Sequence, residues 1–165
     1  MLINSTDALG NASSQLAQGI VCGNLRLAFA FDWARQIVDS YELESIPRAP
    51  GWVLGAVNIS GAIIPVIDLA NYFLESAEPA QAVRGQRLLV GGIQAEDAEE
   101  AFAVVFNQAP VQLEYLTQPI DQQHQLPARL VEVCLGVAHA PSGEQYLEID
   151  AERLMDALSI ELSVT

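Results

Sequence analysis

The stretch over residues 46–69, IPRAPGWVLGAVNISGAIIPVIDL, constrains the fold of this chain more than any other segment. Two mainly apolar runs, 52–59 and 62–69, flank the dipeptide formed by Ser60 and Gly61. A turn dipeptide between two apolar arms is the sequence pattern of a β-hairpin. We therefore expect two strands joined by a tight turn at Ser60 and Gly61.

The prolines of this stretch limit what else it can form. Pro47 and Pro50 fix the backbone and prevent a helix from running into the hairpin. Pro65 has no amide N–H to donate to a ladder, so its strand should lie at an edge there or carry a bulge. Both faces of the arms are largely apolar, which predicts a hairpin covered on both sides.

The rest of the chain repeats the pattern of short strands separated by turn residues. Residues 32–40 fit either a helical turn or the start of a strand. Roughly nine or ten short strands with frequent turns predict an all-β barrel or sandwich. Besides the hairpin, the expected strands cover 18–22, 25–31, 41–46, 86–93, 101–106, 111–116, 130–138 and 145–149.

One convincing helix is expected, at residues 150–160, because Asp150 can cap its first turn. A turn or two of helix also fits 68–74. Residues 75–85, ESAEPAQAVRG, have the small and polar composition of an internal linker. Residues 1–15 have the composition of a flexible leader.

The charge balance excludes some classes of partner. The chain has 165 residues, which suits one domain, and its 21 acidic residues outnumber seven arginines, with no lysine and a net charge of −14. Such a charge repels phosphate backbones, so neither nucleic acid nor an anionic membrane is expected as a partner. It favours a partner with a basic face, or serves only to keep an apolar protein soluble.

No run of apolar residues is long enough for a membrane span, and the N-terminus lacks the features of a signal peptide. We therefore expect a cytoplasmic protein without direct membrane insertion. In that compartment, Cys22 and Cys134 should be buried thiols, although a disulfide between them is an alternative.

The sequence contains no recognisable motif for a catalytic, cofactor or metal site. His124 and His139 have no partner at a metal-ligand spacing. Asp68 fits either a catalytic carboxylate or a helix cap. A run of carboxylates between two expected strands is more typical of a solvated loop than of a calcium site; it consists of Glu96, Asp97, Glu99 and Glu100.

The hairpin stretch closely resembles the signature of the CheW-like family, the coupling proteins of bacterial chemosensory arrays. The family pattern has two prolines, an aromatic residue, a glycine, Asn-Leu-Arg-Gly and then Pro-Val-Ile-Asp-Leu. The matching positions are Pro47, Pro50, Trp52, Gly55, residues 58–61 and residues 65–69. The resemblance continues upstream over 25–46 and downstream through AFAVVFNQ, LVEVCLGVAHA and YLEIDAERLM.

This resemblance implies an all-β fold of two packed, five-stranded SH3-like β-barrels with a C-terminal helix. The single domain would then span 16–165, with sub-barrels at 25–74 and 86–149 on either side of the 75–85 linker. It also implies a non-enzymatic adaptor that uses no cofactor. Its partners would be the regulatory domain of a CheA-type histidine kinase and the cytoplasmic tip of a methyl-accepting chemoreceptor.

Two positions depart from the family pattern. Ser60 stands where the family carries an arginine, and Gln36 stands where it carries a glutamate. Both changes remove a charge while the apolar framework is kept, and such framework residues hold a fold while contact residues choose its partner. The departures favour a divergent or accessory member, for example one of a pilus-based twitching pathway that binds a kinase or another partner without receptor contact.

The expected partner-binding surface runs along one barrel. For its apolar members the alternative is a place in the core, and for its glycines a role in backbone shape alone. A rival function is a small acidic ligand-binding or enzymatic barrel with a pocket around His139 or Asp68. The surface consists of Ile37, Val38, Leu43, Ile46, Gly55, Asn58, Ser60, Gly61 and Ile63.

Overall fold

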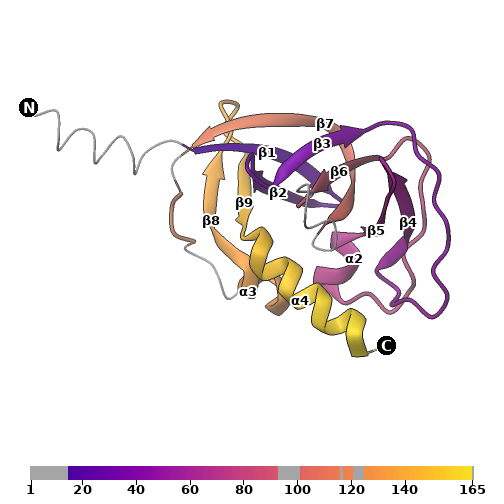
Figure 1. The fold of residues 1–165 in the computed structure, drawn as a ribbon. Helices are drawn as coiled ribbons and strands as arrows, with labels where there is room; N and C mark the ends of the chain where they lie inside the picture. The colour runs from indigo at the N-terminus through magenta and orange to yellow at the C-terminus, as the bar shows by residue number, and fades with distance from the viewer. Residues whose placement is uncertain (1–14, 93–100, 116, 121–124, 165) are drawn as a thin grey trace, which may run out of the picture.

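The computed structural model describes residues 15–92, 101–115, 117–120 and 125–164 (Figure 1). The expected leader therefore lies almost entirely outside the described residues, as do the carboxylate run at 96–100 and His124. Among the described helices, none has the length and apolar character needed to cross a membrane.

The first of two joined sheets, sheet A, contains five strands in the spatial order β7-β1-β2-β9-β8. β1 and β2 form an antiparallel hairpin, and β2 runs parallel to β9. The strands are β1 (Gln15–Cys22), β2 (Leu25–Ala30), β7 (Phe102–Tyr115), β8 (Cys134–His139) and β9 (Gln145–Ile149).

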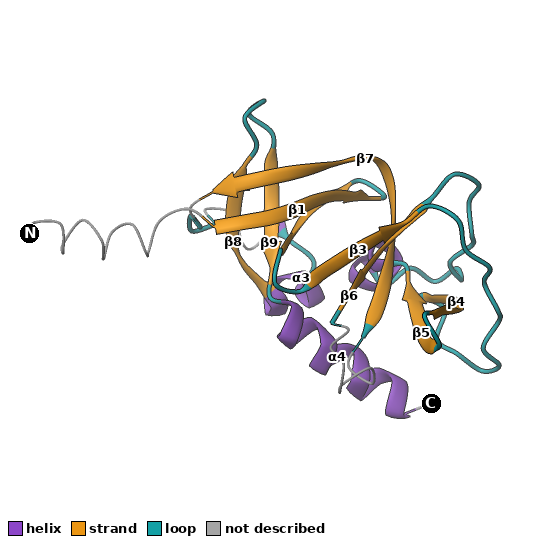
Figure 2. Ribbon diagram, turned by 45° about the horizontal axis from the view of Figure 1, so that its top comes forward, coloured by secondary structure: helices purple, strands orange, loops and turns teal. Residues whose placement is uncertain are grey.

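The second sheet, sheet B, has the order β3-β6-β7-β5-β4 and shares β7 with sheet A. Its other strands are β3 (Ala34–Val38), β4 (Val53–Ile59), β5 (Ala62–Ile67) and β6 (Arg87–Gly91). The segment that fitted either a turn of helix or a strand is thus the strand β3. Figure 2 shows β7 extending from the β1 side of the molecule to the β5 side.

The length of β7 corrects the expectation of two separate strands at 101–106 and 111–116. Three residues of β7 stand opposite the single residue of β1 between Gly19 and Val21, which forms a bulge in the ladder. Gln108 adopts a φ of 63° there, and Pro110, which cannot donate a ladder hydrogen bond, lies in the same bulge. The bulge lets one strand turn from sheet B into sheet A.

The fold is mainly β, as predicted, but the strands that the structure describes do not close into barrels through continuous ladders. Single bridges link Glu44 to Ala56 beside sheet B and Gln118 to Val137 beside sheet A. Sheet A takes its strands from both ends of the chain, since β2 pairs with β9, whereas β3 to β6 of sheet B lie between them in sequence. The sub-barrel bounds at 25–74 and 86–149 stay a prediction.

Within the described residues, three helices pack around the sheets: α2 (Leu69–Leu74), α3 (Ala128–Val133) and α4 (Ala151–Val164). Asp68 caps α2, because its Oδ1 accepts a hydrogen bond from the amide of Asn71 at 3.0 Å. Asp150 likewise accepts a bond from the amide of Arg153 at 3.1 Å. Both capping interpretations are confirmed, and α4 runs four residues beyond the expected end at 160.

Two expected strands are wrong. Within 130–138, the part up to Val133 belongs to helix α3, and β8 begins only at Cys134. Leu130 and Val133, three residues apart, are buried on one side of α3. Residues 41–46 form no strand, and only Glu44 makes a bridge there.

The core is built from large apolar side chains between sheet A, the neighbouring strands of sheet B and the three helices, and Phe29, Phe73, Phe102 and Phe106 lie at its centre. Cys22 and Cys134 are buried free thiols, as expected. Desolvation raises the pKa of both thiols, so they stay protonated and unreactive in the folded chain.

Candidate docking surface

The tip of the β4–β5 hairpin is fixed by its turn residues. Ser60 and Gly61 have φ values of 52° and 91°, and positive φ at both central positions is the requirement of a type I′ turn. Asn58 supports the turn, because its Oδ1 accepts a hydrogen bond from the amide of Gly61 at 2.9 Å. The predicted hairpin is therefore confirmed, and its tip is a rigid, exposed projection.

Pro65 lies where sequence reasoning required. It stands opposite Ala56 of β4, and the ladder between β5 and β7 begins only at Val66, so no β7 partner is opposite the proline. The expectation of a hairpin covered on both sides is wrong at the tip: Asn58 is exposed, and Ile63 is 66% exposed. These two residues stand opposite each other in the ladder and leave a partly apolar surface open.

Gly55 lets the segment that contains Glu42 and Glu44, which we call the crossing segment, lie close against β4. Its φ is 152°, and a Cβ atom there would lie 2.6 Å from the carbonyl oxygen of Glu44. The missing side chain lets Glu44 exchange two backbone hydrogen bonds with Ala56, at 2.9 and 2.8 Å. Gly55 is buried, so it positions the surface and does not form part of it.

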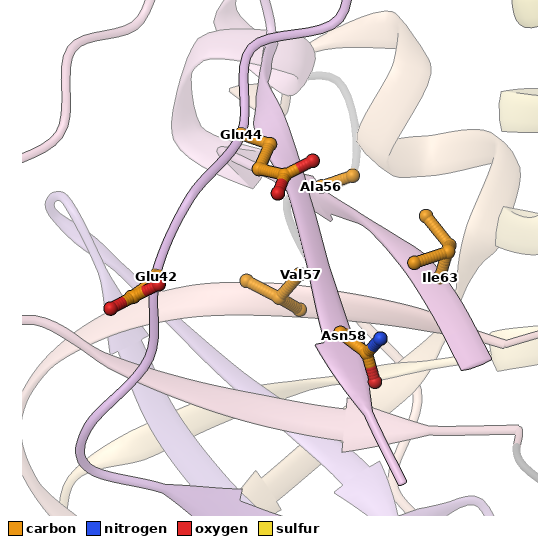
Figure 3. A pocket seen from close by; sticks show the side chains of 6 residues that line it. All are labelled: Glu42, Glu44, Ala56, Val57, Asn58 and Ile63. Atoms are coloured by element: carbon orange, nitrogen blue, oxygen red, sulfur yellow. The ribbon is translucent and has the colours of Figure 1, made fainter. Parts of the chain in front are cut away.

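Between the crossing segment and the β4–β5 hairpin lies a cavity of about 270 Å³, which we call the hairpin groove (Figure 3). The carboxylates of Glu42 and Glu44 come from the crossing segment, while Asn58 and Ile63 come from the two hairpin arms. In the part of the chain that the structure describes, neither carboxylate forms a salt bridge. The hairpin groove therefore combines uncompensated negative charge with an exposed aliphatic side chain.

The remaining predicted surface residues fall into different environments. Ile37 and Val38 on β3 are half-buried and pack against the core, as does Leu43. Ile46 lies in the loop before β4 and is 39% exposed. The structure thus brings Asn58, Ser60, Gly61 and Ile63 together at the tip, whereas Ile37 and Val38 lie on the strand at the other end of the sheet order.

Leu43 also lines a second, open groove of about 370 Å³ together with residues 39–41 and 82–86. Tyr41 is fixed there, because its hydroxyl donates to the carbonyl oxygen of Gln86 at 3.1 Å. Burial raises the pKa of Tyr41, so this hydroxyl keeps its proton. Val83, which sequence reasoning did not select, is 60% exposed beside this groove.

Glu42 and Glu44 were not among the predicted surface residues. Their alternation with Tyr41 and Leu43 nevertheless indicated that the two carboxylates face solvent. Neither His139 nor Asp68 lines the two grooves. Across the described residues, no three or more His, Cys, Asp and Glu side chains are grouped to hold a metal ion.

Two joined five-stranded sheets, with grooves beside the β4–β5 hairpin, define a small β-rich domain. The model of the CheW-like domain family matches residues 18–159. The chain therefore belongs to the CheW-like family.

Among solved structures, the chain is similar to the crystal structure of the scaffolding protein TtCheW from Thermoanaerobacter tengcongensis. The two share 16% identity at a TM-score of 0.61, over 82% of this chain and 88% of that one. This likeness shows a shared fold. No curated protein matches the chain.

Proposed function

We propose that the chain is a non-enzymatic chemosensory adaptor that couples a CheA-type histidine kinase to a chemoreceptor. The observation that carries this proposal is the family match over 142 of the 165 residues, counted from 18 to 159. The similarity in fold to a protein described as a scaffold adds support. The regulatory domain of the kinase is the first proposed partner, and the cytoplasmic tip of the receptor is the second.

The contact surface that we propose for the kinase is the hairpin tip with its groove. Ile63 projects from an ordered strand, so its burial in a complex would cost little conformational entropy of the backbone. Beside it, Glu42 and Glu44 favour a partner with basic side chains. Of the predicted surface residues, Asn58, Ser60, Gly61 and Ile63 are exposed at this tip. Ile37, Val38, Leu43 and Ile46 stay proposed contacts outside it, and Gly55 contributes by positioning the hairpin.

A second candidate function is that of a related adaptor, in a pilus or twitching pathway, that binds the kinase or another partner without contacting a receptor. Ser60 favours this candidate, since it places a neutral hydroxyl at the exposed turn where the family pattern has an arginine. A guanidinium offers several donors in a fixed plane, and a serine cannot replace that contact.

The test is calorimetric titration of the full chain with two proteins from the same organism: the kinase regulatory domain and a soluble cytoplasmic receptor fragment. Binding of both supports coupling, and binding of the kinase alone supports the second candidate. If neither binds at concentrations up to about 100 µM, the adaptor proposal is wrong, because specific protein complexes are commonly tighter than that.

Carbodiimide cross-linking can locate the contact on this chain. The reagent joins carboxylates to amines, and the chain contains no lysine side chain. Apart from its N-terminal amine, it therefore cannot cross-link to itself in this way. Links between partner lysines and Glu42 or Glu44 would map the hairpin groove to the interface, and links only to carboxylates elsewhere would move the interface away from it.

A further inference from the structure

A second acidic site lies apart from the hairpin groove. It is a cavity of about 590 Å³ between the ends of β2 and β9 and the first turns of α4, which we call the acidic cavity. Among the residues that the structure describes, it shares no lining residue with the hairpin groove, and none of those that line it is basic. Trp33 and Met155 contribute apolar surface, and the carboxylates are Asp32, Glu148, Asp150, Glu152 and Asp156.

Glu148 is the buried charge of this site. It is 4% exposed, and its Oε1 accepts a hydrogen bond from the hydroxyl of Thr117 at 2.6 Å. Within the described residues, no cation lies at salt-bridge distance from Glu148, and its Oε2 has no donor. A buried carboxylate is costly unless a positive group compensates it. Because Glu148 lines the acidic cavity, a positive group bound in that cavity can compensate its charge.

Only part of the remaining negative charge is compensated within the chain. Asp150 pairs with Arg153 at 3.5 Å and also caps α4. Over the described ranges, Asp32, Glu152 and Asp156 form no salt bridge. These three carboxylates are exposed and line the same cavity as the buried Glu148, so the field in the cavity attracts a cation.

Trp33 gives the cavity a fixed aromatic wall. Its ring packs against Phe29 and Phe102, with centroid distances of 4.9 and 4.8 Å. It also lies so close to Gly91 that a Cβ atom at that position would overlap the indole. The missing side chain of Gly91 thus makes room for the tryptophan. A held indole beside carboxylates is a favourable environment for a planar cation.

We propose that the acidic cavity binds an arginine side chain carried on a segment of a partner protein. The guanidinium group presents several N–H donors in one plane to carboxylates, and it stacks on aromatic rings better than an ammonium group does. Leu135, 47% exposed at the rim, and Met155 suit apolar residues on either side of that arginine. The net charge of −14 disfavours a second copy of this chain as the occupant.

The test uses a blocked peptide with the sequence Gly-Leu-Arg-Leu-Gly and a matched peptide in which citrulline, neutral and similar in shape, replaces the arginine. The indole N–H signal of Trp33 in the full chain is followed by NMR, with the buried Trp52 as an internal reference. The arginine peptide should shift the Trp33 signal and leave Trp52 unmoved. The citrulline peptide should bind at least about tenfold more weakly, because charge-assisted hydrogen bonds are lost.

Variants identify the carboxylates. Glu148→Gln keeps an oxygen that can accept the Thr117 hydrogen bond but removes the buried charge, and Asp32→Asn changes an exposed residue with little risk to folding. Each variant should lower the affinity for the arginine peptide by about five- to tenfold. Glu42→Gln, with the same charge change in the hairpin groove, should not alter its affinity.

Three results would overturn the proposal. The first is equal affinity for the arginine and citrulline peptides, or no shift of Trp33 up to about 5 mM peptide. The second is wild-type affinity in both Glu148→Gln and Asp32→Asn. The third is self-association of the chain that Arg35→Gln abolishes, since Arg35 is exposed two residues after Trp33 and would then be the natural occupant. None of these outcomes depends on whether the kinase binds the hairpin groove.

Discussion

The carbonyl oxygen of Glu44 lies 2.6 Å from the position that a Cβ atom would take on Gly55. The crossing segment and β4 are therefore held together at a point where no side chain fits. This contact sets the position of Glu42 and Glu44 relative to the hairpin tip.

Gly55→Ala should lower the free energy of unfolding by about 2–4 kcal/mol, because it adds a clash with backbone to an unfavourable φ. Urea denaturation measures the loss. Gly61→Ala is the matched control: its φ is 91°, but no atom lies within 4 Å of the added Cβ. It should cost only about 1–2 kcal/mol from the left-handed conformation. Equal costs at the two glycines would show that the approach of Glu44 is not the constraint.

The sequence predicts a structural feature well when the residues that determine the feature are close together in the chain. Ser60 and Gly61 define the hairpin within four residues, and Asp68 and Asp150 cap the helix that follows each of them, so these features were predictable. The apolar run that contains Leu130 would be buried whether it formed a helix or a strand. Its hydrophobicity therefore could not show which of the two it forms. The continuity of β7 depends on a bulge at Gln108, a non-glycine residue with positive φ that no local pattern indicates.

The sites depend on contacts between distant segments. Asn58 and Ser60 could be assigned to the exposed tip from the hairpin alone. The hairpin groove, however, exists because Glu44 crosses Gly55, and the acidic cavity because Asp32 is brought beside Glu148. Such juxtapositions follow from the strand order, in which β2 lies next to β9, and single-sequence periodicity does not contain that order.

Ile63→Ser should weaken binding of the kinase regulatory domain at least about tenfold, because an exposed aliphatic side chain at the centre of a contact is a common source of binding energy. Calorimetric titration measures the change. Ile160→Ser is the control, since Ile160 is also 66% exposed but lies on α4. Both variants should stay within about 0.5 kcal/mol of wild-type stability. Equal affinities of the two variants for the kinase would contradict a contact through the hairpin tip.

Ser60→Arg should raise the affinity for the receptor fragment at least about tenfold if the lost charge is what separates this chain from the family pattern. The turn should tolerate the change, because Ser60 is already a non-glycine residue at positive φ and is exposed. Ser159→Arg adds the same charge on an exposed position of α4 and should have no effect. Unchanged receptor affinity in Ser60→Arg would place the divergence elsewhere on the surface.

Stability should fall at alkaline pH through Cys22. Burial first, and the charge of Asp68 second, raise the pKa of this thiol above its ordinary value of 9.0. Above pH 9 the unfolded chain releases this proton and the folded chain keeps it, so the free energy of unfolding decreases as pH rises. The stability that depends on this proton is fully present below pH 9. Above pH 9 the free energy of unfolding falls by up to about 1.4 kcal/mol per pH unit.

Urea denaturation under reducing conditions between pH 8 and 10.5 tests this slope. Cys22→Ala should remove the part of the slope that belongs to one proton, although the smaller side chain lowers stability at every pH. Cys134→Ala is the comparison, because its pKa is also raised, but a backbone hydrogen bond with Gly136 opposes the effect of burial. A slope in Cys22→Ala identical to that of the wild type would contradict the assignment.

Arg129 joins the three helices, and its replacement should separate a geometric role from a charge role. The guanidinium of this α3 residue donates to the carbonyl oxygen of Tyr72 at 3.0 Å and to Glu161 of α4 at 2.9 Å. It also lies 4.5 Å from the centre of the Tyr72 ring. Only a planar group with several donors can make these contacts together.

Arg129→Lys should therefore lower the free energy of unfolding by about 1–2 kcal/mol although the charge is kept. Arg153→Lys makes the same change in the pair with Asp150 at the start of α4. Because Arg153 is exposed there, the pair contributes little to stability, and the change should cost less than about 0.5 kcal/mol. Thermal and urea denaturation of both variants measure the difference. If Arg129→Lys is as stable as the wild type, the charge of Arg129 alone stabilises the helices, and the fork of donors that it extends to Tyr72 and Glu161 contributes nothing.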